Sequence, residues 1–185
     1  MRIIAGIARG MSLAVPRGGH VRPTSDRVRG AVFSSLGDRV VGATVLDLFA
    51  GTGALGLEAA SRGANAVMFA ESASGALKIL QQNVAAFSRG RTISCELVVI
   101  RAEALAHVVK LAAAQKKFSL IFADPPYGEA AQSLLGVSDL PEVLDHEGLF
   151  VLESGKRDAL AALVPWRLMR EAVYGDTRVS FFAAH

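Results

Sequence analysis

From residue 44 onward, short apolar segments alternate with segments of helical periodicity, and this alternation restricts the chain to a small group of folds. Apolar strands joined by helices form a parallel sheet that helices cover on both faces. We expect strands near 44–48, 66–70, 94–100, 118–123 and 148–153, and helices near 54–62, 73–87, 102–114 and 129–145, the last broken around Gly136 and Pro141. Residues 166–173 and 177–183 flank Tyr174-Gly175-Asp176 and predict a terminal antiparallel hairpin. The sequence therefore predicts an α/β fold with a mostly parallel sheet.

The first 41 residues carry the chain's excess of positive charge. They hold seven arginines and no lysine against two aspartates, a balance of +5, whereas residues 42–185 have a balance of −2. Arginine is suited to bidentate phosphate contacts and to stacking on bases. This asymmetry is typical of a polyanion-binding element joined to a nearly neutral domain, although a solvated basic surface would give the same balance. We therefore divide the chain into an N-terminal extension, 1–41, and a main domain, 42–185.

The N-terminal extension also has its own secondary-structure pattern. Residues 2–7 and 11–15 are partly β-branched and predict a pair of strands that turns at Arg9-Gly10. A helix is expected from about 26 to 36, with Thr24 or Ser25 as its N-cap. The extension should therefore consist of a β-hairpin followed by a helix.

Several features of the sequence argue against other classes of protein. No apolar run approaches the roughly 18 residues that a membrane span needs. Cys95 is the single cysteine, so it cannot form an internal disulfide, and no Cys/His cluster has the spacing of a zinc site. We therefore expect a cytoplasmic protein that binds no metal and no membrane.

The segment after the strand at 44–48 predicts a cofactor-binding loop. Gly51 and Gly53 permit a tight turn and a close approach of the backbone to a ligand. The helix that begins near Ala54 presents free N–H groups at its N-terminus. Gly51-Thr-Gly-Ala-Leu-Gly56 also fits G-x-G-x-x-G, and Glu71, 20 residues after Gly51, could bind ribose hydroxyls, so a dinucleotide remains an alternative.

Asp47 distinguishes between the two cofactors. Its carboxylate precedes Gly51 by four residues, at the expected rim of the loop, where it would repel a pyrophosphate and attract the ammonium group of S-adenosylmethionine. Glu103, after the third strand, is expected at the same edge of the sheet. It could accept from an adenine amino group while the Ala104 N–H bonds a ring nitrogen, or it could be a first-turn acid favoured by the helix dipole. S-adenosylmethionine is therefore the expected cofactor.

A second motif predicts where the chemistry takes place. The strand at 118–123 ends in Asp124-Pro125-Pro126-Tyr127. Prolines lack N–H groups and fix the backbone, so their carbonyls and the Asp124 carboxylate form a rigid set of acceptors. Such acceptors can hold an exocyclic amine so that its lone pair points at an electrophilic methyl, while Tyr127 stacks on a flipped base. The alternative is a proline-rich turn in which Asp124 caps a helix.

These motifs resemble those of a known family. Asp47-Leu-Phe-Ala-Gly-Thr-Gly53, Glu71 and Asp124-Pro-Pro-Tyr127 are similar to class I methyltransferases that act on amino nitrogens. Across essentially its whole length the chain resembles the RsmD family, bacterial 16S rRNA guanine-N2 methyltransferases, in Met1-Arg-Ile-Ile-Ala-Gly6, Gly10, Arg22-Pro-Thr-Ser-Asp-Arg-Val-Arg29, Phe150-Val-Leu-Glu-Ser154 and Tyr174-Gly-Asp-Thr177.

The resemblance implies a seven-stranded Rossmann-like fold with an N-terminal β-hairpin that helps to hold RNA. It implies methylation of one guanine in 16S rRNA, on the 30S subunit or an assembly intermediate. By matching positions, the cofactor would contact Asp47, Gly51, Gly53, Glu71 and Glu103, and the base would face Asp124 and Tyr127. Arg22 and Thr24 would lie near the mouth of the active site, and Arg9 and Arg17 are candidates for phosphate contacts. The family usually has Glu and Asn where this chain has Gly30 and Ser34, so a functional carboxylate at position 30 cannot be carried over.

Three other functions remain open at this point. An adenine-N6 or cytosine-N4 DNA methyltransferase shares the Asp-Pro-Pro-Tyr segment, but 185 residues leave little room for a separate DNA-recognition domain. A NAD-dependent oxidoreductase would account for G-x-G-x-x-G. A non-enzymatic RNA-binding factor would account for the basic extension but not for the intact segment from Asp124 to Tyr127. We expect a monomeric methyltransferase.

Overall fold

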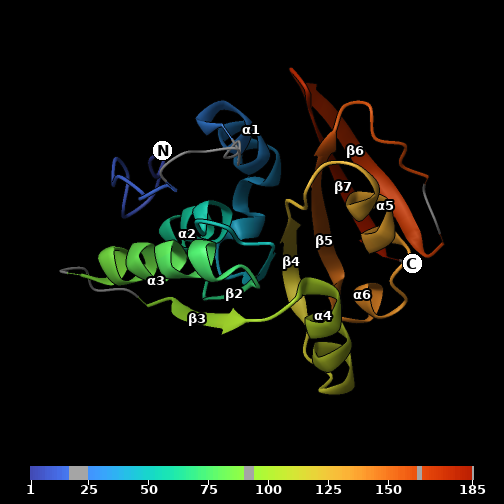
Figure 1. The fold of residues 1–185 in the computed structure, drawn as a ribbon, viewed down its shortest axis with the longest axis horizontal. Coiled ribbons are helices and arrows are strands. Elements are labelled where there is room, and N and C mark those ends of the chain that lie inside the picture. Colours follow the sequence, from blue (N-terminus) through green and yellow to red (C-terminus); the bar gives the residue numbers. More distant parts are fainter. Residues whose placement is uncertain (17–24, 90–93, 162–163, 185) are drawn as a thin grey trace.

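The computed structural model describes residues 1–16, 25–89, 94–161 and 164–184 of the chain. A seven-stranded sheet forms the centre of the fold (Figure 1), and its strands are β1 (Thr44–Leu48), β2 (Ala66–Glu71), β3 (Glu96–Arg101), β4 (Phe118–Ala123), β5 (Leu144–Gly155), β6 (Trp166–Tyr174) and β7 (Thr177–Ala184). The strand order is β3-β2-β1-β4-β5-β7-β6. Pairs among β1 to β5 are parallel, and β7 is antiparallel to β5 and β6. The predicted mostly parallel sheet with a terminal hairpin is confirmed.

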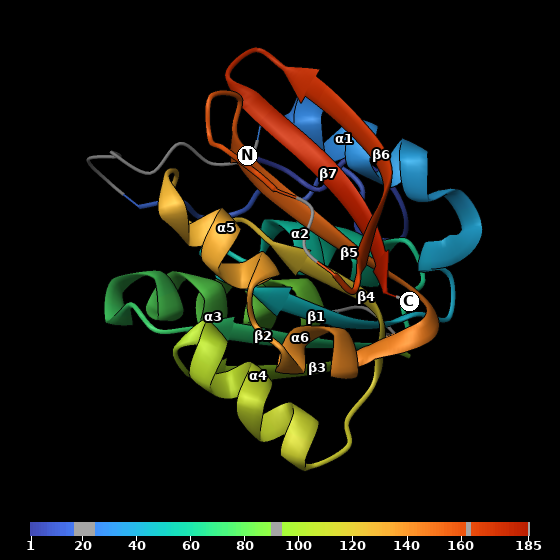
Figure 2. The same ribbon diagram turned by 90° about the vertical axis from the view of Figure 1, so that its right-hand side faces the viewer.

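Helices cover both faces of this sheet. They are α1 (Asp26–Leu36), α2 (Ala54–Ser61), α3 (Ser74–Ser88), α4 (Ala104–Ala113), α5 (Glu129–Leu135) and α6 (Asp139–Glu142), and the short 3-10 helix η1 (Gly37–Val40) follows α1. Helices α1, α2 and α3 pack on one face, and α4, α5 and α6 pack on the other (Figures 1 and 2).

Alternating strand residues build a separate hydrophobic core on each face. Val45 and Phe122 point towards α1 and α2, whereas their neighbours Leu46 and Ile121 point towards α4, α5 and α6. All four side chains are completely buried. Because successive side chains of a strand point to opposite faces, a strand covered on both sides must be apolar at nearly every position. This requirement explains the largely apolar segments on which the sheet prediction rests.

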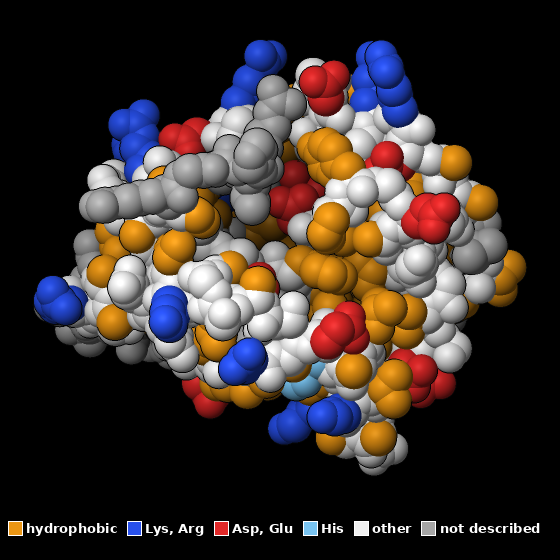
Figure 3. Space-filling model, viewed as in Figure 1, with side chains coloured by type: hydrophobic (Ala, Val, Ile, Leu, Met, Phe, Trp, Pro, Cys, Tyr) orange, Lys and Arg blue, Asp and Glu red, His pale blue; other side chains and the backbone are white. Residues whose placement is uncertain are grey.

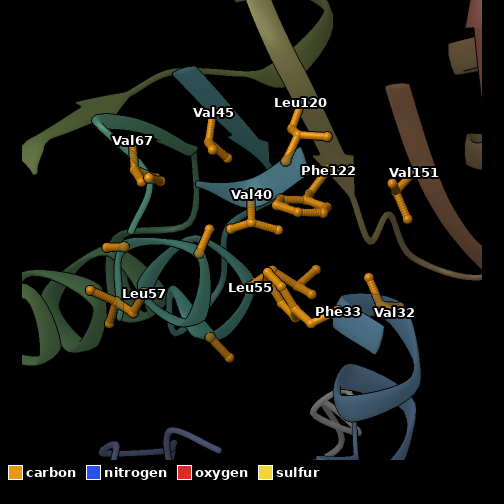
Figure 4. Close-up of a cluster of buried hydrophobic side chains, with 14 of the residues drawn as sticks. Val32, Phe33, Val40, Val45, Leu55, Leu57, Val67, Leu120, Phe122 and Val151 are labelled. Carbon is orange, nitrogen blue, oxygen red and sulfur yellow. The ribbon is translucent and has the colours of Figure 1, made fainter. Parts of the chain in front are cut away.

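The helix predicted from 26 to 36 is present as α1 and joins the extension to the sheet. Ser25 is its N-cap and accepts the Val28 N–H at 3.2 Å. The helix runs through Gly30 without a break. Phe33 packs against Phe122 of β4 with ring centroids 5.7 Å apart (Figure 4). The extension therefore contributes to the same hydrophobic core as the main domain, while the division of the chain at residue 41 stays a prediction.

The predicted strand pair over 2–7 and 11–15 is wrong in its extent. In the described part of the chain, a single bridge between Arg2 and Ser12 joins the two segments. The N–H groups of Ile4 and Ala5 donate instead to the Glu58 carboxylate at 2.7 and 3.1 Å. The pairing stops after Ile3, whose N–H bonds the Met11 carbonyl, because Glu58 of α2 accepts the Ala5 N–H that would continue the ladder.

A buried ion pair holds this segment against α1 and α2. Arg29 and Glu58 are both completely buried, with Arg29 Nε and Glu58 Oε2 3.7 Å apart. Arg29 Nη2 also donates to Asp26 Oδ1 at 2.9 Å and to the Arg2 carbonyl. The chain therefore uses two buried charges to fix its first residues, a feature that charge counting did not predict.

The helix expected over 129–145 is corrected in two places. The break at Gly136 is present, since Gly136 is the C-cap of α5. Pro141 does not break a helix but is the third residue of α6, where the absent N–H would have no partner within the helix. Residues from Leu144 onward belong to β5.

Candidate active site

The loop between β1 and α2 has the backbone conformation that its glycines predict. Gly51 and Gly53 have φ angles of 56° and 79°, in the region that favours glycine. Gly53 is the N-cap of α2, so the N-terminus of this helix lies at the loop. A Cβ at Gly56 would lie 2.3 Å from the Phe69 ring, so glycine is needed for α2 to pack this closely on the sheet. Contact between these glycines and a cofactor stays a prediction.

Asp47 lies beneath the loop. Its side chain is 2% exposed, and its Oδ2 accepts the Gly56 N–H at 2.9 Å. Burial raises the pKa of Asp47 to about 8; the Gly56 hydrogen bond opposes this shift, and the carboxylates of Asp124 and Glu71 add to it. A buried carboxylate with acidic neighbours is costly to ionise, and a cation beside it lowers that cost. The end of β1 is therefore suited to a positively charged group and unfavourable for an anion.

Glu71 ends β2 and links that strand to the glycine loop. Its Oε2 accepts the Gly51 N–H at 2.8 Å, and its Oε1 accepts the Ala73 N–H at 2.7 Å. These bonds fix the carboxylate, yet each oxygen keeps a lone pair that a hydroxyl group could donate to. Glu71 therefore remains a candidate ribose ligand, already oriented by the loop.

Glu103 caps a helix. It is the N-cap of α4, and its two carboxylate oxygens accept the N–H groups of Leu105 and Ala106 at 3.1 and 2.8 Å. Ala104 is the first residue of that helix and is buried. Glu103 is exposed at the carboxyl end of β3. Its contact with adenine, and that of the Ala104 N–H, stay predictions beside this capping role.

The Asp124-Pro125-Pro126-Tyr127 turn follows β4 at the same edge of the sheet. Asp124 is half-buried, Pro125 is buried and Pro126 is exposed. The Tyr127 side chain is 49% exposed, and its hydroxyl forms a 2.9 Å hydrogen bond with Thr177 Oγ1 of β7. The N-cap of the next helix is Gly128, so the alternative in which Asp124 caps that helix does not apply. The ring is held at its hydroxyl end while much of its surface can still contact a ligand.

The two motifs meet because β1 and β4 are neighbours. Asp47 pairs with Phe122, and Asp124 follows Phe122 by two residues. Asp124 is close enough for its charge to raise the pKa of Asp47. The register of β4 and β5 pairs Ala123 with Leu152, so Asp124 and the buried Glu153 each follow directly after one of these paired residues. Figure 3 shows an acidic side chain at the bottom of a hollow bordered by hydrophobic side chains. The sequence signal for Glu153 was a single acid within an apolar strand, to which we assigned no role of its own.

A cavity of about 480 Å³ adjoins the turn and is lined by Tyr127, Gly155, Lys156, Arg157, Asp158 and Asp176. Asp158 Oδ2 accepts the N–H groups of Gly155 and Gly128 at 2.7 and 3.2 Å. These bonds tie the end of β5 to the residue after Tyr127. Lys156 and Arg157 are exposed beside the turn, and the sequence analysis did not identify them as part of the site.

The predicted RNA-contacting residues lie mostly outside the described ranges. Arg17, Arg22 and Thr24 fall in residues 17–24, which are not among those described. Arg9 is described and is exposed on the extension. Within the described ranges, His, Cys, Asp and Glu side chains form no group of three that could hold a metal ion. None of the helices described is both long and apolar enough to cross a membrane.

The protein family described as Conserved hypothetical protein 95 matches residues 1–183. The chain belongs to this family. It is 35% identical over 179 residues to the Ribosomal RNA small subunit methyltransferase D of Escherichia coli (strain K12), covering 95% of this chain and 86% of that protein. It is 34% identical over 182 residues to the protein of the same name from Haemophilus influenzae, covering 95% of this chain and 89% of that protein. The resemblance to the RsmD family is confirmed.

Solved structures agree with this membership of the Conserved hypothetical protein 95 family. A hypothetical protein from Thermus thermophilus is 30% identical and superimposes with a TM-score of 0.82 over 100% of this chain and 99% of that chain. The T. thermophilus 16S rRNA N2 G1207 methyltransferase RsmC, solved with AdoMet and guanosine, is 24% identical with a TM-score of 0.66, covering 92% of this chain and 45% of that chain. The second likeness shows a shared Rossmann-like methyltransferase fold.

Proposed function

We propose that this protein transfers a methyl group from S-adenosylmethionine to the exocyclic N2 amine of one guanine in 16S rRNA of the small ribosomal subunit. The observation that carries the proposal is the parallel register of β1 and β4, which pairs Asp47 with Phe122 and so brings the glycine loop next to the turn that begins at Asp124. Relatives at 34% and 35% identity are named ribosomal RNA small subunit methyltransferases, and this supports carrying the reaction and the rRNA substrate to this chain.

The charges at the glycine loop favour S-adenosylmethionine over a dinucleotide. Asp47 is buried, and Asp124 and Glu71 are near enough to act on its ionisation. Such a group of carboxylates attracts ammonium and sulfonium charges and repels a pyrophosphate. We assign the amino-acid part of the cofactor to Asp47 and the loop N–H groups, the ribose to Glu71, and the adenine to Glu103 and Ala104. When bound, the cofactor supplies an electrophilic methyl carbon.

The turn after β4 orients the nitrogen that accepts this carbon. The amine of guanine is a weak nucleophile because its lone pair is delocalised into the ring. The Asp124 carboxylate and the Pro125 carbonyl accept its two N–H bonds, so that the lone pair points at the methyl carbon, and Tyr127 stacks on the flipped base. Once methylated, the nitrogen would be acidic, and its proton would pass to the Asp124 carboxylate that already accepts this N–H, so Asp124 need not remove it beforehand.

The basic extension supplies the contacts to RNA. Arg9 is exposed, and together with Arg17, Arg22 and Thr24 it is assigned to the rRNA backbone and the mouth of the site. Such phosphate contacts release counterions, so each one adds to the salt dependence of binding. The substrate is the 30S subunit or an assembly intermediate, and the enzyme acts as a cytoplasmic monomer.

A methylation assay with labelled S-adenosylmethionine tests this function against the DNA methyltransferases and the RNA-binding factor. The substrates are 30S particles from a strain that lacks the orthologous enzyme and, in parallel, duplex DNA. We expect label only in the 16S rRNA, and only in N2-methylguanosine after digestion to nucleosides. Label in DNA alone, or in no nucleic acid, would contradict the proposal.

Calorimetric titration tests the cofactor independently of the substrate. S-adenosylhomocysteine should bind and NADH should not, because the carboxylates near the loop disfavour the pyrophosphate. Binding of NADH without binding of S-adenosylhomocysteine would support the oxidoreductase instead.

A further inference from the structure

Asn83 of α3 joins the N-terminal extension to the glycine loop. It is 2% exposed, and its Oδ1 accepts the Ala14 N–H at 2.8 Å. Its Nδ2 donates to the Ala14 carbonyl at 3.1 Å and to the Thr52 carbonyl at 2.9 Å. A single buried amide therefore bonds the backbone of the extension on one side and the middle of the glycine loop on the other.

The partners of Asn83 lie next to the two proposed binding regions. Thr52 stands between Gly51 and Gly53, the residues assigned to the cofactor. Ala14 precedes, by three positions, the segment 17–24, where the sequence predicts contacts with RNA. Asn83 uses both of its N–H bonds and one acceptor site in this arrangement, and its burial leaves it no water to replace a lost partner.

Helix α3 supports the loop at a second point. Leu80 precedes Asn83 by three residues and is completely buried. A Cβ at Gly53 would lie 2.4 Å from Leu80 Cδ1, so the loop and the helix are in tight contact. The loop packs against α3 through Leu80 and is hydrogen-bonded to it through Asn83. A displacement of the loop backbone is therefore transmitted to α3 and, through Asn83, to the backbone of Ala14.

We propose that Asn83 is a positioning residue that couples cofactor binding to RNA binding. The inference rests on the proposed function, which places the cofactor at the loop and the RNA on the extension. A cofactor that fixes the loop also fixes the Thr52 carbonyl, and Asn83 then holds the backbone of the extension at Ala14. By linkage, RNA bound to the extension strengthens cofactor binding by the same factor, and couplings of this kind commonly amount to about 5- to 150-fold.

Ser61 offers a matched control because it anchors the extension away from the loop. Its Oγ donates to the Ala5 carbonyl at 2.6 Å and accepts the Ala8 N–H at 3.0 Å. It is the last residue of α2, whereas the glycine loop adjoins the first. The change Ser61→Ala therefore weakens the attachment of the extension without touching Asn83 or Thr52.

The test is equilibrium dialysis of labelled S-adenosylhomocysteine with and without saturating 30S subunits, which allows no turnover. The proteins are the wild type, Asn83→Ala, Ala14→Pro and Ser61→Ala, each first shown to be folded by circular dichroism and thermal melting. Ala14→Pro removes the N–H that Asn83 accepts but keeps the Ala14 carbonyl and the bond to Thr52, so it weakens the connection on the side of the extension alone. Filter binding of 30S subunits with and without S-adenosylhomocysteine measures the reciprocal effect.

In the wild type we expect 30S subunits to tighten S-adenosylhomocysteine binding at least about fivefold. The ratio of the S-adenosylhomocysteine affinity with 30S subunits to the affinity without them should fall close to one in Asn83→Ala. It should fall part of the way in Ala14→Pro and persist in Ser61→Ala. A wild-type ratio of one, a ratio that survives Asn83→Ala, or an equal loss in Ser61→Ala would each overturn the coupling role while leaving methyl transfer intact. If the wild type binds no S-adenosylhomocysteine, the proposed function itself fails.

Discussion

The Oδ2 atom of Asp47 accepts the Gly56 N–H at 2.9 Å, and this hydrogen bond joins β1 to α2 directly beneath the glycine loop. The bond forms within the protein alone, so the first turn of α2 is held against β1 before a cofactor binds. Asp47 is 2% exposed and has acidic neighbours, and its carboxylate is therefore poorly stabilised until a cation lies beside it. The geometry gives one residue a role in holding the loop and in selecting the charge of the ligand.

The raised pKa of Asp47 predicts how stability depends on pH without cofactor. Burial raises this pKa from 3.8 to about 8, so between these values the folded protein binds a proton that the unfolded chain has released. The stabilising contribution is complete below pH 3.8 and is lost as pH rises towards about 8. The loss should be at most about 1.4 kcal/mol per pH unit.

Urea unfolding at several pH values measures this slope, and Asp47→Asn is the matched variant because it keeps the shape and cannot titrate. We expect the free energy of unfolding to fall with pH more steeply in the wild type than in the variant. Equal slopes in the two proteins would show that Asp47 does not carry a raised pKa.

Asp124 serves the base and not the cofactor. Asp124→Ala should lower kcat about 100- to 1,000-fold, the usual cost of removing one preorganised group that stabilises the transition state. Affinity for S-adenosylhomocysteine, measured by calorimetry, should change by no more than a few-fold. Retained turnover, or loss of cofactor binding on the same scale as the loss of kcat, would contradict the assigned role.

Tyr127 contributes through its ring and through its hydroxyl separately. Tyr127→Ala removes a stacking surface worth about 1–3 kcal/mol per base and should raise KM for 30S subunits accordingly. Tyr127→Phe keeps the ring and removes only the 2.9 Å hydrogen bond to Thr177, so it should stay close to wild type in KM. Steady-state kinetics of both variants test this order, and a larger defect in Tyr127→Phe would show that the hydroxyl, not stacking, matters.

Glu58 holds the first residues of the chain. Its completely buried carboxylate accepts the Ile4 and Ala5 N–H groups and lies 3.7 Å from Arg29 Nε. Glu58→Ala leaves buried partners uncompensated and should lower the free energy of unfolding by about 3–5 kcal/mol in urea. The exposed Glu129→Ala is the control and should change it by less than about 0.5 kcal/mol. A similar small effect in both variants would contradict the anchoring role.

The sheet was predictable from the sequence because its pattern is local. The strands β1 and β4 have the bounds that were predicted for them, 44–48 and 118–123. Within the extension, α1 was predicted correctly, but the extent of the strand pair was not, because the groups that limit it, Glu58 and Ser61, lie more than fifty positions away in the sequence. An apolar segment with free N–H groups looks the same whether a second strand or a helix side chain accepts them.

In the candidate site, too, some features were predictable from the sequence and others were not. Parallel strands bring their carboxyl ends to one edge, so the sequence could place Asp47, Glu71 and Asp124 together. It could not show that Asp47 is buried under the loop, since that depends on how closely α2 packs at Gly56. Asn83 carried no signal, because an asparagine in the middle of a helix is ordinary until the fold brings Ala14 and Thr52 to it.

The position of a bound cofactor relative to Asp124 tests the central claim most directly. A crystal structure with S-adenosylmethionine would give the separation between the methyl carbon and the Asp124 carboxylate. We predict that the methyl faces the Asp124–Tyr127 turn across a space that fits one amine nitrogen, about 3 Å from each side. A sulfonium centre on the far side of the glycine loop, with its methyl directed away from this turn, would contradict the account.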